Sequence, residues 1–146
     1  MTTSSTDNTK NLPAGIGIDV VDIPRFKDAF QRQGFREKVF TCSEIEACES
    51  KSDALPSYAV RFAVKEALYK ALADPSLKSV PWQQIETKIV NDIPTICLSD
   101  ALRERIGNRS AFLSLTHTSQ IAAAVVLLLP NSNKTGSSNI QRGSNP

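Results

Sequence analysis

The stretch PSYAVRFAVKEALYKALA, residues 56–73, predicts a long buried helix and decides the fold. Asp53 or Leu55 stands near its N-terminal cap, and Pro75 follows just after its C-terminal end. A helix that is apolar almost all round is expected to lie inside the protein, with other elements packed on most of its surface. The apolar side chains that cover this helix are Tyr58, Val60, Phe62, Val64, Leu68, Tyr69 and Leu72.

One narrow face of this helix differs from the rest. Two small residues, Ala59 and Ala63, share it with two opposite charges, Glu66 and Lys70. The simplest interpretation is an i,i+4 ion pair on the surface, which stabilises a helix by about 0.2–0.5 kcal/mol. A helix with so little solvent-facing surface makes a surface ion pair harder to accept, so a functional role for Glu66 is the alternative.

The segment 14–21 predicts a strand, because every second residue from Ile16 to Val20 is aliphatic. Asp19 lies inside this otherwise apolar strand, and Gly17 shares its face. A glycine in a strand often marks a position where a ligand approaches the backbone, so open space is expected beside the Asp19 carboxylate. An aspartate at a strand end that caps a turn is an equal alternative.

Shorter elements surround these two, and together they predict an α+β fold with a mostly antiparallel sheet and a long central helix. The expected domain covers 13–130, between tails at 1–12 and 131–146 that are too polar to fold. The other predicted elements are a helix capped by Asp22 that runs to about Gln33, a short helix after Thr41, a hairpin of strands 84–90 and 95–98 turning at Asn91 and Asp92, a helix from Ser99 to about Gly107, and strands 111–116 and 121–129.

Composition excludes several classes of protein. The chain has 146 residues and a formal net charge of +2, which is too weak to favour nucleic acid. Three cysteines without a CxxC pair, and one distant histidine, give zinc little support and suit reduced thiols in the cytosol. The N-terminus lacks the apolar core of a signal peptide, and the longest apolar run, 121–129, is too short for a membrane helix. We therefore expect a soluble cytoplasmic protein.

Two carboxylates and a lysine suit a site for magnesium and a diphosphate. Mg²⁺ is usually held by one or two carboxylates, with substrate phosphates and water completing its shell. A lysine beside it can neutralise charge that develops during phosphoryl transfer. The sequence contains no GxxxxGK[ST] phosphate loop, so side chains and metal would have to hold the phosphates. Asp19, Glu66 and Lys70 are the candidates for this site.

Three sequence blocks, in this order, resemble the signatures of the holo-acyl-carrier-protein synthases, the short single-unit branch of the 4′-phosphopantetheinyl transferases. They are GIGIDVVDIPRF (15–26), RFAVKEALYKAL (61–72) and SLTHT (114–118), and the first two are specific in combination. FREKVFTCSEI (35–45) and NDIPTICLSD (91–100) are similar to the family's connecting stretch and later hairpin. The resemblance covers 13–130. It implies transfer of the 4′-phosphopantetheine arm of coenzyme A to a serine of an apo-acyl carrier protein, with release of adenosine 3′,5′-bisphosphate.

The resemblance also implies roles for single residues. Asp19 and Glu66 would bind magnesium, and Lys70 would contact the diphosphate of coenzyme A, which makes these three the catalytic set. Arg25 would engage the acidic helix of the carrier protein. The base that takes the serine proton stays open between Glu66 and a metal-bound water.

Further matches concern the coenzyme A site. The resemblance places His117 there. Arg61 and Lys65 also match the second block, and two interpretations stay open: they bind the nucleotide phosphate, or they reach solvent with their stems packed on the core. Two positions depart from the family pattern. The loop 73–75 has no glycine, and Thr118 stands where an acidic residue is usual.

Long members of the wider family carry two similar halves and place the active site between them, whereas this chain has only one such half. The resemblance therefore implies a homotrimer, with the active-site cleft between subunits. The apolar segment 121–129 is either that contact or the centre of the sheet. The excess of basic residues over 22–38 would speed encounter with an acidic carrier, or is a solvated helix face.

Fatty acid biosynthesis is the expected pathway, with secondary metabolism open. Two other functions stay open: a metal-dependent nucleotide or diphosphate hydrolase, and a non-catalytic subunit that binds coenzyme A.

Overall fold

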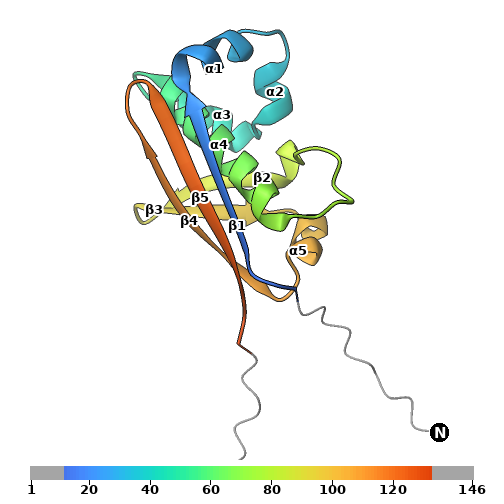
Figure 1. Ribbon diagram of the computed structural model, residues 1–146. Coiled ribbons are helices and arrows are strands. Elements are labelled where there is room, and N and C mark those ends of the chain that lie inside the picture. Colours follow the sequence, from blue (N-terminus) through green and yellow to red (C-terminus); the bar gives the residue numbers. More distant parts are fainter. Residues whose placement is uncertain (1–11, 133–146) are drawn as a thin grey trace, which may run out of the picture.

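The computed structural model describes residues 12–132 and has the predicted α+β architecture (Figure 1). The tails predicted at 1–12 and 131–146 lie almost entirely outside these residues. In chain order the elements are β1 (Gly15–Asp22), α1 (Ile23–Phe30), α2 (Phe35–Val39), α3 (Cys42–Glu49), α4 (Ala54–Leu72), a short 3-10 helix (Trp82–Gln84), β2 (Ile85–Val90), β3 (Ile93–Leu98), α5 (Asp100–Ile106), β4 (Arg109–His117) and β5 (Ile121–Pro130).

Strands from the two ends of the described chain form one antiparallel sheet in the order β1-β5-β4. Asp19 pairs with Ala124, and Ala124 pairs with Leu115 on the other side. Along the central strand, Ala124 and its alternate neighbours are buried, whereas Val125 lies on the opposite, partly exposed face. The strand predicted at 121–129 is therefore the central strand of the sheet, which is one of its two predicted roles.

The second sheet is the hairpin of β2 and β3. Its turn residues, Asn91 and Asp92, have φ values of 50° and 63°. Two-residue hairpin turns of type I′ need positive φ at both central positions, and Asn and Asp tolerate this conformation best after glycine. The predicted hairpin and the position of its turn are confirmed.

Side-chain caps start the helices where the sequence predicts them. The Asp22 carboxylate accepts a hydrogen bond of 2.9 Å from the backbone N–H of Arg25. Thr41 and Glu44 form a capping box at the start of α3, with each side chain accepting from the other residue's backbone N–H. The Ser99 hydroxyl accepts from the backbone N–H of Leu102 at the start of α5.

The region between α1 and α3 differs from the prediction. The first helix ends at Phe30 rather than near Gln33, and a separate one-turn helix, α2, follows. Gly34 takes the left-handed conformation with φ of 77° and redirects the chain between them. Five residues complete little more than one turn, which leaves too short a window for apolar periodicity to reveal a helix.

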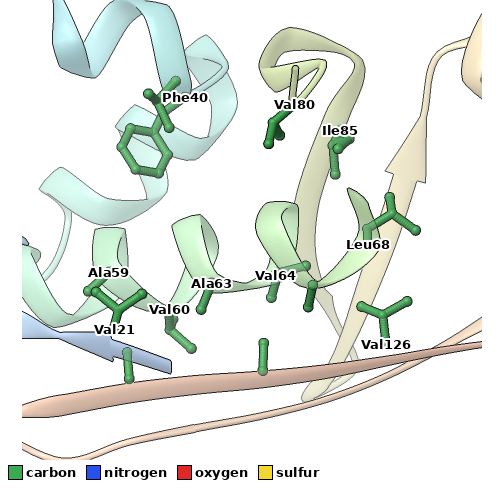
Figure 2. Packing of buried hydrophobic residues seen from close by; sticks show 14 of the residues in the cluster. Val21, Phe40, Ala59, Val60, Ala63, Val64, Leu68, Val80, Ile85 and Val126 are labelled. Atoms are coloured by element: carbon green, nitrogen blue, oxygen red, sulfur yellow. The ribbon is translucent and has the colours of Figure 1, made fainter. Parts of the chain in front are cut away.

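The core lies on both sides of α4. Figure 2 shows Ala59, Val60 and Ala63 pointing to the side of β1 and β5, while Phe40 and Val80 lie on the opposite side. The residues of α4 with no exposed surface are Tyr58, Ala59, Ala63, Val64, Lys65, Ala67 and Leu68. The prediction of a buried central helix is therefore confirmed. Within residues 12–132, no helix is long and apolar enough to cross a membrane.

Candidate active site

Two glycines of β1 let the backbone of α4 lie directly on the strand. A Cβ atom on Gly17 would lie 1.8 Å from the carbonyl oxygen of Ala67, and one on Gly15 would lie 2.0 Å from that of Ala71. Any side chain would therefore force the helix away. The open space predicted beside Asp19 is filled by this helix, so the expectation of a ligand against Gly17 is wrong. The glycines instead bring residues of α4 close to Asp19.

Lys70 of α4 reaches across to Asp19 of β1. Its Nζ donates hydrogen bonds to Oδ1 of Asp19 at 2.8 Å and to the carbonyl oxygen of Ile18 at 3.0 Å. The Lys70 side chain is 49% exposed and that of Asp19 is 15% exposed. Among the ion pairs of residues 12–132 there is none between Glu66 and Lys70, so the simple i,i+4 interpretation is wrong.

Glu66 lies partly buried beside this pair. Burial raises the pKa of its carboxyl group, the negative charge of Asp19 raises that pKa further, and Lys70 opposes both effects. Asp19 is therefore close enough to disfavour the negative charge of Glu66, and Lys70 offsets this effect only in part. A divalent cation would relieve this excess of negative charge.

Asp19 and Glu66 line one pocket of about 600 Å³ between β1, α1 and α4. Aromatic rings of Phe26, Phe35 and Phe62 form its apolar part, and these three rings contact one another. The remaining lining residues are Val20, Val21, Asp22, Arg25, Asp28, Ala29 and Arg32. The pocket thus joins an acidic end to an apolar wall and two arginines.

Comparisons with known proteins identify the family. A sequence profile described as the 4′-phosphopantetheinyl transferase superfamily matches residues 15–126. The chain belongs to this superfamily. The predicted family and enzyme class are confirmed.

Its relatives include holo-[acyl-carrier-protein] synthases of known sequence. That of Chlamydia trachomatis serovar L2 is 36% identical over 115 residues, which cover 77% of this chain and 97% of the relative. That of Chloroherpeton thalassium is 39% identical over 121 residues, which cover 80% and 98%. The match to nearly the full length of both relatives supports a transferase over either alternative, the hydrolase or the non-catalytic subunit.

Solved structures show the same fold. The holo-(acyl-carrier-protein) synthase from Bacillus anthracis, in complex with CoA (3′,5′-ADP), gives a TM-score of 0.67 at 27% identity, covering 80% of this chain and 96% of that one. The Helicobacter pylori enzyme, in complex with coenzyme A, gives a TM-score of 0.65 at 32% identity, covering 78% and 99%. The α+β fold of this transferase is therefore the fold of the holo-acyl-carrier-protein synthases.

Of the other residues that match the transferase signatures, Arg25 lies at the pocket and His117 does not line it. Arg25 is exposed near the start of α1. His117 is exposed at the end of β4, two strands away from β1. Within residues 12–132, the structure therefore gathers Asp19, Glu66, Lys70 and Arg25 and leaves His117 apart.

The solvent interpretation of Arg61 and Lys65 is wrong, because the two residues are 7% and 0% exposed. Lys65 also cannot serve as a phosphate ligand in this arrangement. Its Nζ pairs with Glu44 at 2.7 Å and donates to the carbonyl oxygens of Val39 at 2.7 Å and Trp82 at 2.8 Å. These three acceptors use all the hydrogens of the ammonium group.

Arg61 is held differently. One terminal nitrogen donates to the carbonyl oxygen and to the hydroxyl of Ser57, at 3.1 Å and 2.7 Å. Its Nε is buried without a hydrogen-bond partner. No ion pair of residues 12–132 includes Arg61, so a nearly buried guanidinium keeps an uncompensated charge.

Sequence reasoning missed Glu44, which is 1% exposed in the core. The capping box in Thr41–Glu44 was visible in the sequence, but such a box usually lies at the surface. The partner that buries this carboxylate, Lys65, is distant in the chain, and no local pattern joins the two residues.

Proposed function

We propose that this transferase moves the 4′-phosphopantetheine arm of coenzyme A to a serine of an apo-acyl carrier protein and releases adenosine 3′,5′-bisphosphate. The observation that carries the proposal is that Asp19 and Glu66 line one pocket, while Lys70 pairs with Asp19. Relatives that are 36% and 39% identical are holo-[acyl-carrier-protein] synthases, and two relatives of the same fold are complexes with coenzyme A.

Magnesium fits the carboxylates of Asp19 and Glu66. Lys70 donates a hydrogen bond to Oδ1 of Asp19, which leaves Oδ2 of Asp19 and the Glu66 carboxylate as oxygen ligands for the metal. Residues 12–132 contain no group of three or more acidic, histidine or cysteine side chains placed to hold a metal, so two carboxylates would be the protein's share of the ligands. Substrate phosphates and water would supply the rest, as is usual for this ion. When bound, magnesium would polarise the phosphoryl oxygens.

The side chains then have separate tasks. Lys70 holds Asp19 in place and keeps one ammonium hydrogen for a phosphate oxygen, because only two are used by Asp19 and Ile18. Its charge would stabilise the negative charge that spreads over the phosphoryl oxygens in the transition state. We propose that the Glu66 carboxylate, which lines the pocket with Asp19, receives the serine proton.

Arg61 and His117 are proposed ligands of the coenzyme A nucleotide. The buried, unpaired Nε of Arg61 and its lack of an acidic partner among the described residues suit an anion such as a phosphate. His117 is exposed and outside the pocket, so we propose that it contributes to the coenzyme A site of a neighbouring subunit.

A homotrimer is supported by the outer face of the sheet. Ile16, Ile18 and Val20 of β1 are 70%, 59% and 60% exposed. The register places Val125 of β5 beside Ile18, and Phe112 of β4, which is 55% exposed, lies on the same face. A contiguous apolar face of this kind usually contacts another protein. We propose that copies of the chain cover it.

The charge-introducing change Ile18→Lys is expected to convert the trimer to monomers. A lysine at the centre of the outer face would have to be buried without a partner, which costs far more than an exposed lysine. Sedimentation velocity measures the result. Ala101→Lys, which adds the same charge at an exposed position of α5, should stay trimeric. A trimeric Ile18→Lys variant would exclude this face as the interface.

Arg25→Ala is expected to raise the KM for the carrier protein about tenfold, with the KM for coenzyme A nearly unchanged. Arg25 is exposed beside the pocket, where an acidic carrier helix would meet it, and a lost charge contact of this kind costs about 1–2 kcal/mol. Initial rates with either substrate varied measure both constants. Arg103→Ala on α5 removes the same charge outside this pocket. A raised KM for coenzyme A alone would place Arg25 in the nucleotide site instead.

We place the enzyme in the cytoplasm, and the carrier protein in fatty acid biosynthesis. The described part of the chain carries Cys42, Cys48 and Cys97 as free thiols, of which Cys42 is exposed, and reduced thiols are usual in the cytosol.

One assay tests the proposed reaction. The protein is incubated with coenzyme A, Mg²⁺ and an apo-acyl carrier protein, and the carrier is weighed by mass spectrometry. A phosphopantetheine adduct on the carrier, together with adenosine 3′,5′-bisphosphate, is the expected result. Cleavage of coenzyme A without an adduct would indicate a hydrolase, and an unchanged mixture would indicate a binding subunit.

A further inference from the structure

Lys65 and Glu44 form an ion pair in the centre of the protein, away from solvent. Their charged atoms lie 2.7 Å apart, and both side chains are 0% exposed. Burial lowers the pKa of Lys65, and Glu44 opposes this effect. A buried ion pair is weak evidence for added stability, because desolvation of both charges offsets their attraction. Stability alone therefore does not explain why this pair is present, one residue before Glu66 of the candidate active site.

The hydrogen bonds of this pair connect five segments. Lys65 of α4 donates to the end of α2 at Val39 and to the 3-10 helix at Trp82. The Glu44 carboxylate accepts from the backbone N–H of Thr41, which precedes α3, at 3.0 Å and from that of Thr87 in β2 at 2.8 Å. The Lys65 ammonium group thus uses all three of its hydrogens, and the Glu44 carboxylate accepts three hydrogen bonds, all within the protein.

On the opposite side of α4, hydrogen bonds to β1 come from Lys70, whose half-exposed side chain donates to Asp19 and to the carbonyl oxygen of Ile18. There the helix rests on Gly15 and Gly17, which offer no side chains to interlock with it. At 3.6 residues per turn, Lys65 lies roughly 160° around the helix from Ala67, whose carbonyl faces Gly17. The Lys70 head group is half exposed at the end of a long stem, whereas the Lys65 bonds are fully buried, so the Lys65 contacts fix the rotation of the helix more firmly. Glu66 follows Lys65 directly in the chain.

We propose that Lys65 and Glu44 are positioning residues, which set the rotation of α4 about its axis and so hold the Glu66 carboxylate toward Asp19 and the magnesium site. This inference rests on the proposed function, because it assigns the Glu66 carboxylate to magnesium. It assigns no contact with substrate to either residue. Loss of the pair would turn or loosen the helix on its glycine contacts and would weaken the metal site before it unfolds the protein.

The test compares Lys65→Met, Glu44→Gln and the double variant. Calorimetric titration of Mg²⁺ into each protein, in the presence of coenzyme A, measures metal affinity independently of turnover. All three variants are expected to bind Mg²⁺ at least about tenfold more weakly, as is typical when a group that orients a ligand is removed. High Mg²⁺ should then recover much of the transfer rate, because a weakened site can still be filled.

Leu102→Ala is the control for stability alone, since Leu102 is fully buried on α5 and does not line the pocket. It should lower the melting temperature and leave Mg²⁺ affinity unchanged. The double variant exchanges a charged pair for a neutral one, so its melting temperature should exceed that of Lys65→Met and keep it measurable if the single variant fails to fold.

Two results separate the inference from the function on which it rests. Wild-type Mg²⁺ affinity in the folded double variant would overturn the positioning role, even if melting temperatures fell. Normal transfer by Glu66→Gln would instead refute the proposed metal site itself. If Glu66→Gln is inactive and the double variant binds Mg²⁺ normally, the function stands and this inference fails.

Discussion

The change Glu66→Gln is expected to lower the transfer rate by roughly a thousandfold and, at neutral pH, to make the protein more stable. The first effect follows from the loss of a carboxylate at the proposed magnesium site. The second follows from the surroundings of Glu66, where burial and the charge of Asp19 raise its pKa and Lys70 only partly compensates. A glutamine has nearly the same shape and no charge to be repelled.

The sign of the stability effect follows from linkage. The folded protein binds the Glu66 proton more tightly than the unfolded chain does, so the free energy of unfolding falls as pH rises from the ordinary glutamate pKa through the raised folded value. Above that raised folded value the loss is complete. The glutamine variant does not incur it, so the gain in stability should be present at pH 7 and vanish in acid, below the ordinary glutamate pKa.

Thermal melts without Mg²⁺, from pH 4 to pH 8, measure the stability, and the carrier mass assay with Mg²⁺ measures the transfer. Asp19→Asn should also abolish transfer, but without a clear gain in stability, because it removes the partner that Lys70 holds at 2.8 Å. Glu104→Gln, at an exposed position of α5, should change neither quantity. A Glu66→Gln protein that is inactive but less stable at pH 7 would mean that the carboxylate serves the fold rather than the metal.

The order of elements could be predicted from sequence because the signals for it are local. The length and apolar cover of α4, the alternation in β1 and the caps at Asp22, Thr41 and Ser99 each depend on a few neighbouring residues. The proximity of Asp19 to Glu66 is not a local property. It became predictable only through the resemblance of the blocks at 15–26 and 61–72 to one family.

The errors of prediction at the candidate site share one physical cause, which is contact between distant segments. In the alternating pattern of β1, Gly17 lies on the same face as Asp19. Only the tertiary packing shows that a helix, not a ligand, fills the space beside Gly17. Lys65 carries a charge on a helix with little solvent face, and only its three acceptors from other segments explain how that charge is buried. Neither fact leaves a trace in periodicity or composition.

Gly17→Ala is expected to destabilise the protein severely. The added Cβ would lie 1.8 Å from the Ala67 carbonyl oxygen and 2.7 Å from the Ala71 nitrogen, and both atoms belong to helix backbone that cannot turn aside. Overpacking of a core usually costs about 1–3 kcal/mol, and a clash between two backbones lies at or above the upper end. Since domains of this size are stable by only about 5–15 kcal/mol, a fall of many degrees in the melting temperature should result.

The same change should also inactivate the protein that remains folded, because the clash is relieved only by moving α4 away from β1. That movement separates Glu66 and Lys70 from Asp19. Gly34→Ala is the matched control: its Cβ meets no atom within 4 Å, although its φ of 77° makes alanine unfavourable by about 1 kcal/mol. It should melt slightly earlier and keep transfer per folded molecule. If Gly17→Ala behaved like this control, α4 would not rest on β1, and the two carboxylates would lose the contact that brings them to one pocket.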